Sequence, residues 1–160
     1  MPDRTFHTTC QEQVYGEVKS MLGELTDEFS DDADHCDFYL KYGSTVIEIS
    51  IEPFEEDNAV IEVLAYCVQG VDATPELMRE LLAMNAQIDL GAFSLVGEDV
   101  FFSHSFIGRH VRAPQLLASL QSVAATSDLY DDKIVSRYGG ETALDRLRGW
   151  SRRTRRTEAG

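Results

Sequence analysis

The segment from Ala59 to Val68 constrains the fold most, because an extended chain here would be apolar on both sides. Successive side chains of a strand point to opposite faces of a sheet, and only Glu62 interrupts the two apolar faces. The apolar side chains are Ile61, Val63 and Ala65 on one face, and Leu64, Tyr66 and Val68 on the other. Such a strand is either central in a sheet that is covered on both sides, or it offers one face to a partner.

Two strands are predicted before this segment and two after it. Phe38–Tyr42 and Thr45–Glu52 flank a Gly-Ser turn, and isoleucines alternate with polar side chains in the second of these strands. That alternation indicates one buried face and one solvated face, and Pro53 is expected to stop the strand. Gly91–Val96 and Val100–Ile107 form a second predicted hairpin.

Three helices are predicted from apolar side chains that recur at helical spacing. The first covers Thr9–Thr26, with its first residue as the N-cap of a capping box. The second is leucine-rich, begins after Thr74 and runs to about Asn85. The third begins at Pro114 and ends at a Gly-Gly pair. The order helix, three strands, helix, two strands, helix predicts an α+β fold whose antiparallel sheet has about five strands.

The charge is divided unevenly along the chain. Residues 1–138 are predicted to form one α+β domain, and residues 139–160 a short helical segment with an arginine-rich C-terminal tail. The net charge is -14, yet residues 146–160 hold six arginines and one acidic residue. The tail is open to three interpretations: a solvated chain end, a tether to an acidic surface such as this chain's own body, or a nucleic-acid contact. The residues expected to make such a contact are Arg152, Arg153, Arg155 and Arg156.

The sequence shows no arrangement of residues for catalysis or for a cofactor. It contains neither G-x-G-x-x-G nor a Walker P-loop, and neither H-E-x-x-H nor G-x-S-x-G. The acidic stretch Asp31–Asp37 lacks the glycine and the closing glutamate of a calcium loop. We therefore predict that the protein is not an enzyme, with no catalytic, cofactor-binding or metal-binding residues.

Nothing in the sequence predicts export or a membrane partner. No apolar run reaches the roughly 18 residues of a membrane-spanning helix, and the N-terminal residues lack a signal-like apolar stretch. The three cysteines, Cys10, Cys36 and Cys67, are widely spaced and odd in number. A reducing cytoplasm is therefore the expected location.

The apolar face that carries Leu64, Tyr66 and Val68 is a candidate contact surface for another polypeptide, although each of these side chains also suits a protein core. An antiparallel sheet has edges as well, and an edge accepts an extended peptide as an added strand. A binding surface is thus the functional feature that the sequence predicts.

The run Leu81-Leu82-Ala83-Met84-Asn85, the strand Gly91–Leu95 and the hairpin at Gly97 resemble the type III secretion chaperone-like superfamily, in particular its YbjN-like branch. The resemblance covers residues 9–138 and implies a chaperone-like fold. In secretion chaperones, homodimers pair through the second helix and a non-globular client segment wraps around exposed apolar patches. The resemblance therefore implies that a homodimer contact involves the side chains of Leu77, Met78, Leu81 and Leu82.

Two functions from different classes follow. The first is a non-enzymatic module that binds a peptide or protein segment, predicted to be a homodimer, or that acts as a regulatory adaptor. The alternative is a regulatory domain whose basic C-terminal tail contacts nucleic acid or an acidic partner. Outside that tail, nucleic-acid binding is disfavoured because an acidic surface repels phosphates.

Overall fold

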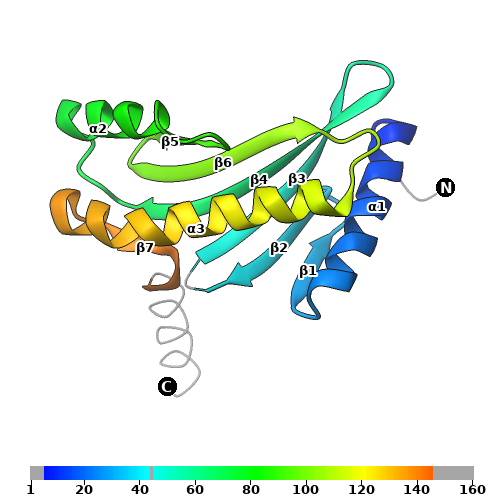
Figure 1. The fold of residues 1–160 in the computed structure, drawn as a ribbon, viewed down its shortest axis with the longest axis horizontal. Coiled ribbons are helices and arrows are strands. Elements are labelled where there is room, and N and C mark those ends of the chain that lie inside the picture. The colour runs from blue at the N-terminus through cyan, green and yellow to red at the C-terminus, as the bar shows by residue number, and fades with distance from the viewer. Residues whose placement is uncertain (1–5, 44, 146–160) are drawn as a thin grey trace, which may run out of the picture.

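The computed structural model describes residues 6–43 and 45–145, and its centre is an antiparallel sheet with strand order β1-β2-β3-β4-β6-β5 (Figure 1). A seventh strand, β7, pairs with the end of β4. The strands are β1 (Phe29–Asp32), β2 (Asp37–Tyr42), β3 (Thr45–Phe54), β4 (Asn58–Gln69), β5 (Ala92–Val96), β6 (Asp99–Ile107) and β7 (Glu141–Thr142). The predicted α+β fold and element order are confirmed, and β1 and β7 are additions that the sequence did not predict.

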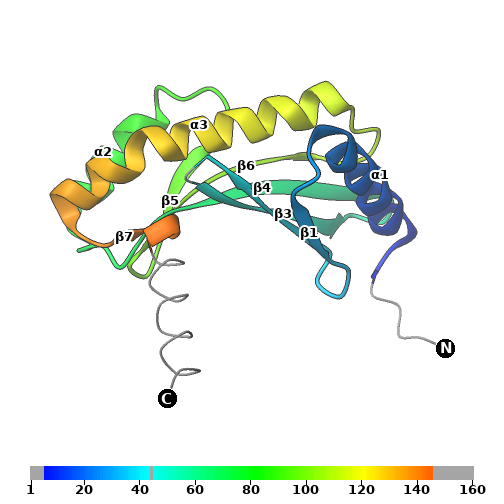
Figure 2. The same ribbon diagram turned by 90° about the horizontal axis from the view of Figure 1, so that it is seen from below.

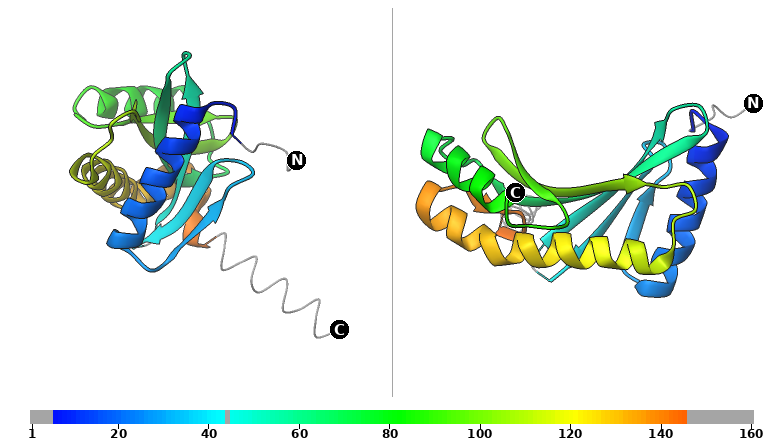
Figure 3. Two further views of the ribbon diagram at one scale, coloured as in Figure 1. Left: turned by 90° about the vertical axis from the view of Figure 1, so that its right-hand side faces the viewer. Right: turned by 45° about the horizontal axis from the view of Figure 1, so that its top comes forward.

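Within residues 6–43 and 45–145, three helices accompany the sheet: α1 (Thr9–Leu25), α2 (Pro75–Asn85) and α3 (Ala113–Tyr138). Figure 2 shows α1 and α3 on the same side of the sheet, and Figure 3 shows α2 beside the C-terminal half of α3. The core lies between the sheet and the two helices that cover it, α1 and α3. It includes Leu22 of α1, Ile49 of β3, Ile61 of β4 and Leu116 of α3, all with no exposed surface.

The ends of the helices follow from local hydrogen bonds. The N-cap of α1 is Thr8 rather than the predicted Thr9, because the Thr8 hydroxyl accepts the Gln11 N–H at 3.0 Å. The buried Gln11 amide donates to the carbonyl of Ile51 at 2.8 Å and thereby ties α1 to β3. The predicted start of α2 is confirmed, since the Thr74 hydroxyl accepts the Leu77 N–H at 3.1 Å.

Pro53 does not end its strand, and this expectation was wrong. The Ile51 N–H donates to the carbonyl of Cys36 at 3.0 Å, on the side of β3 that faces β2. Two residues later the nitrogen of Pro53 points to the same side. It lies beyond the first residue of β2, Asp37, which pairs with Ser50. A missing N–H therefore breaks no strand pairing there, and Pro53 still pairs with Ala59 of β4.

A β-bulge in β4 overturns one of the predicted faces. Tyr66 pairs with Phe101 of β6, but Val68 pairs with Val100, so one extra residue is inserted between the two pairs. As a result Cys67 and Val68 are both buried. Val68 belongs to the core and does not share a face with Leu64 and Tyr66, contrary to the predicted face.

The end of the described chain joins the sheet. Residues 141–142 pair with Val68 and Gln69 as β7, and residues 143–145 are helical. The predicted helical segment therefore begins only after a short strand. Residues 146–160, and with them the four arginines predicted to make contacts, lie outside the described residues.

Candidate functional site

The face of the sheet opposite α1 and α3 is not covered by any helix of the described chain (Figure 2). We call it the open face. Its side chains alternate along each strand with the fully buried ones of the covered face. The half-buried side chains at its centre are Tyr39, Val46, Glu48, Leu64, Tyr66, Phe101 and Ser103.

Strand register brings these residues together from four strands. Tyr39 of β2 pairs with Glu48 of β3, and Glu48 pairs with Leu64 of β4. Leu64 in turn pairs with Ser103 of β6. Paired residues on one face have Cβ atoms about 5 Å apart, so these side chains form a continuous row across the sheet. Two of the predicted contact residues, Leu64 and Tyr66, therefore lie on the open face.

The aromatic part of the open face is held by one ring contact and one hydrogen bond. The ring centroids of Tyr66 and Phe101 are 5.4 Å apart in an edge-to-face arrangement. The Tyr66 hydroxyl donates to the Glu48 carboxylate. Burial, together with that carboxylate, raises the pKa of the Tyr66 phenol, and burial and Glu48 raise the pKa of Tyr39 to about 12. Both phenols are thus neutral donors rather than acid–base groups.

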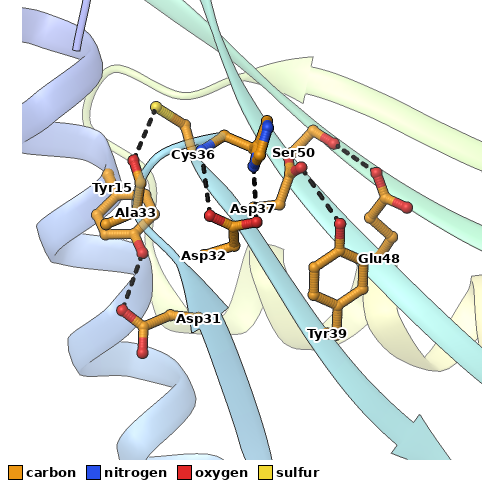
Figure 4. A network of polar contacts seen from close by, with 10 residues as sticks. Tyr15, Asp31, Asp32, Ala33, Cys36, Asp37, Tyr39, Glu48 and Ser50 are labelled. Atoms are coloured by element: carbon orange, nitrogen blue, oxygen red, sulfur yellow. Dashed lines mark hydrogen bonds and ion pairs between the residues drawn. The ribbon is translucent and has the colours of Figure 1, made fainter. Parts of the chain in front are cut away.

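Carboxylates surround the apolar centre, and several of them are drawn in Figure 4. Tyr39 donates to Asp37 at 3.4 Å, and Ser50 donates to Glu48 at 3.4 Å. By strand parity the acidic residues of this face are Asp32, Asp37, Glu48, Glu52, Glu62 and Asp99. Within β1 to β6 the basic residue of the same face is Lys41, so the surface is strongly negative.

Two cavities are relevant here, one beside the open face and one between two helices. One, of about 370 Å³, opens beside β1 and β2 and is lined in part by Tyr39, Lys41 and Val46 of the open face. A larger one, of about 650 Å³, lies between α2 and α3. There Glu80 accepts hydrogen bonds from Arg137 and from the Tyr138 hydroxyl. The smaller cavity therefore extends the apolar strip of the open face.

The second helix divides its leucines between core and surface. Leu77 and Leu81 are 0% and 4% exposed and pack in the core of the described chain. Met78 and Leu82 point outward and are 44% and 69% exposed. We call these two side chains the α2 stripe. A helix that packs on β5 must bury one face, which leaves the i, i+4 pair on the other face for solvent or a partner.

Asn85 limits strand addition at the β5 edge of the sheet. Its side-chain oxygen accepts the Phe93 N–H at 2.7 Å, and its amide donates to the Phe93 carbonyl at 3.0 Å. The end of α2 thereby takes the place of a neighbouring strand at this residue. The edge of β5 is therefore partly covered, whereas the open face is not.

The described residues contain no group of three or more His, Cys, Asp or Glu side chains that could hold a metal ion. The most perturbed carboxyl is that of Asp131 on α3, whose pKa burial raises to about 6. It accepts the N–H of Asp132 at 2.6 Å. A single buried carboxyl whose charged form is disfavoured is a local cost to stability rather than a catalytic pair.

Sequence reasoning missed part of this site. Val46 was not singled out, Glu62 was noted only as an interruption of an apolar strand, and Asp37 only as part of an acidic stretch that lacks the pattern of a calcium loop. The alternation within Thr45–Glu52 did indicate a polar face, but the register that sets Glu48 beside Leu64 depends on long-range pairing. No local signal could have supplied that pairing.

Comparisons with known proteins agree with this architecture. Residues 8–146 match the family model described as T3SS (YopN, CesT) and YbjN peptide-binding chaperone 1. A chain of the solved structure of the HopA1–SchA chaperone–effector complex superimposes with a TM-score of 0.59. That match covers 76% of this chain and 96% of the other, at 9% identity, and so concerns the fold. The search of curated proteins gave no match. Within the described residues, none of the helices has the length and hydropathy to cross a membrane.

Proposed function

This chain belongs to the T3SS (YopN, CesT) and YbjN family of peptide-binding chaperones, and we propose that its open face binds an extended segment of a partner protein. The observation that carries the proposal is the half-buried apolar strip of Leu64, Tyr66 and Phe101, which no described helix covers. Contiguous apolar surface of this kind marks contact sites for other polypeptides. The family is typically non-enzymatic, and we extend that property to this chain.

The surroundings of the strip define the chemistry of the partner segment. Apolar side chains would lie on Leu64 and Tyr66, where the exclusion of water provides most of the affinity. Arginine or lysine side chains on either side would meet Glu48, Glu62 and Asp37. The expected client is therefore an extended segment in which basic and apolar residues are mixed.

A charge placed in the strip should weaken this binding strongly. Short random peptides displayed on phage would be selected on the full chain, and the recovered peptides would be titrated against variants. We expect Leu64→Arg to weaken their affinity by about tenfold or more, because it buries a charge in the contact and repels basic residues. The matched control is Leu129→Arg, since Leu129 is 57% exposed on α3, and it should leave affinity within about twofold.

A second variant keeps this test independent of folding. Glu62→Lys reverses one charge at the rim, on a half-buried side chain, and should weaken basic peptides while leaving the melting temperature near that of the wild type. Selected peptides that bind both variants as tightly as the wild type would refute the open face as the binding site.

We also propose that the α2 stripe forms a homodimer contact. Met78 and Leu82 are large apolar side chains on one side of a helix, and in secretion chaperones the second helix mediates pairing. Burial of such side chains against a second copy would stabilise the dimer by about 1.5–3 kcal/mol for each side chain.

Leu82→Glu is expected to convert the dimer to a monomer, because it would place a carboxylate and its twofold copy in an apolar contact without a partner of opposite charge. Light scattering coupled to size-exclusion chromatography would measure the mass. Leu129→Glu adds the same charge on α3 and should leave the dimer intact. A wild-type protein that is monomeric at high concentration would rule out this contact.

A further inference from the structure

We infer that the arginine-rich tail, residues 146–160, docks on the open face of its own chain and competes there with the partner segment. The occupant is thus a stretch of this protein that follows directly after the described residues. The competition rests on the proposed function of the open face, whereas the docking itself does not need a client. Charge, reach and surface chemistry support the inference separately.

The charges of the two elements are complementary. The open face carries six carboxylates and one lysine between β1 and β6. The tail holds six arginines against the single acid Glu158. Arginine pairs with carboxylates through two parallel hydrogen bonds, and its weak hydration favours contacts on half-buried surfaces. The covered face is closed to the tail, because α1 and α3 already lie on it.

The tail starts at the right place and is long enough. Thr142 of β7 pairs with Val68 of β4, only two residues along the strand from Tyr66 of the open face. Asp145, the last described residue, remains close by, because its N–H donates to the Thr142 hydroxyl at 3.3 Å. The remaining residues reach about 50 Å when extended. Five neighbouring strands span only about 20 Å, so every carboxylate of the face lies within reach.

The apolar centre of the face suits the tail as well. Trp150 lies among the arginines and is the only tryptophan of the chain. An indole ring would find apolar contacts at Leu64 and Val46, which are half-buried on this face. Arginine side chains also stack on aromatic rings such as those of Tyr66 and Phe101. The tail therefore presents the mixture of basic and apolar groups that the open face would select in a client.

Tethering makes this competition effective. A segment attached next to its site acts at an effective concentration in the millimolar range. If the tail occupies the face about nine-tenths of the time, a client binds about tenfold more weakly than to a vacant face. A client must therefore displace the tail. Basic peptides that bind weakly would fail to do so, and the tail would thereby increase the specificity of the open face.

The fluorescence of Trp150 tests the docking without any client. In the full chain at low salt we expect a blue-shifted emission that is protected from acrylamide quenching. Both features should be lost at about 1 M NaCl, where charges are screened within about 3 Å. They should also be lost in the double variant Glu48→Gln/Glu62→Gln. The matched control Glu12→Gln/Glu24→Gln removes two exposed charges from α1, on the covered side, and should change neither feature.

The competition is tested by a tail variant of the full chain. Substitution of Arg152, Arg153, Arg155 and Arg156 by Gln should tighten the binding of a basic peptide selected on the open face by about tenfold at low salt. Trp150 that is equally accessible to quencher at low and high salt would overturn the inference. So would protection that appears only as protein concentration rises, since the tail would then bind another copy. If Trp150 is protected but no peptide binds, the docking stands and the client site fails.

Discussion

Replacing Phe102 by Ala is expected to lower the free energy of unfolding by about 3–5 kcal/mol, the cost of removing a large aromatic side chain from a packed core. Phe102 has no exposed surface and lies on the covered face of β6. Its ring centroid is 4.8 Å from that of Phe93, in an edge-to-face contact. Urea unfolding of the purified variant would measure the loss directly.

The neighbouring Phe101 provides the matched control, because the same substitution one residue earlier acts on the opposite face. Phe101 is half-buried on the open face and contacts Tyr66. Phe101→Ala should cost only about 1 kcal/mol of stability but should weaken peptides selected on the open face. Equal destabilisation by the two substitutions would contradict the assignment of covered and open faces.

A second large loss of stability is expected from Gly91→Ala, which should lower the free energy of unfolding by about 3 kcal/mol or more. Gly91 has φ +102°, a backbone conformation that side chains rarely adopt. A Cβ atom at this position would lie 2.7 Å from Cε1 of Phe102 and 2.8 Å from the carbonyl oxygen of Ser103. The ring is held in the core and the carbonyl belongs to β6, so neither can move aside without disrupting packing.

Gly97→Ala separates backbone strain from this collision. Gly97 also has positive φ, at +62°, but a Cβ there meets no atom within 4 Å. Its substitution should cost only about 1–2 kcal/mol, the penalty of the left-handed conformation. Thermal unfolding of both variants gives the difference, which reports the collision at Gly91. Similar losses in the two variants would mean that β5 can shift away from β6.

The open face and the tail together suggest how a small acidic protein can offer apolar surface without aggregating. We expect the carboxylates around Leu64 and Tyr66 to repel the open face of another copy, because like charges would then meet. On the proposed function, the same carboxylates attract basic segments of a client, and on the further inference they attract the tail. The variant set above separates these roles, because Leu64→Arg acts on the apolar strip, Glu62→Lys on the rim and the arginine substitutions on the competitor.

Much of the secondary structure could be predicted from local signals. Thr74 and Pro75 begin α2. In β3 the isoleucines occupy every second position, and these positions form its buried face. These signals act within a few residues, so no knowledge of the fold is needed. The expectation failed at Pro53, because the end of the neighbouring strand β2 decides whether a proline is tolerated there.

Which residues form the candidate site could be predicted only in part. The sequence identified Leu64 and Tyr66 by their place in a strand that is apolar on both sides. It also grouped Leu77 and Leu81 with Met78 and Leu82, although only the last two are exposed. Composition indicates that a helix is rich in leucine, but the element packed against it decides which leucines are buried.

By itself, the sequence determined the element order, the apolar and polar periodicity of the strands, and the opposition between an acidic body and a basic tail. The tertiary structure alone decided that α1 and α3 cover the same side of the sheet, that a bulge buries Val68, and that Glu48 lies beside Leu64. The physical reason is the separation along the chain of the residues that interact. Capping and periodicity depend on neighbours a few residues apart, whereas register and coverage depend on contacts between segments far apart in the chain.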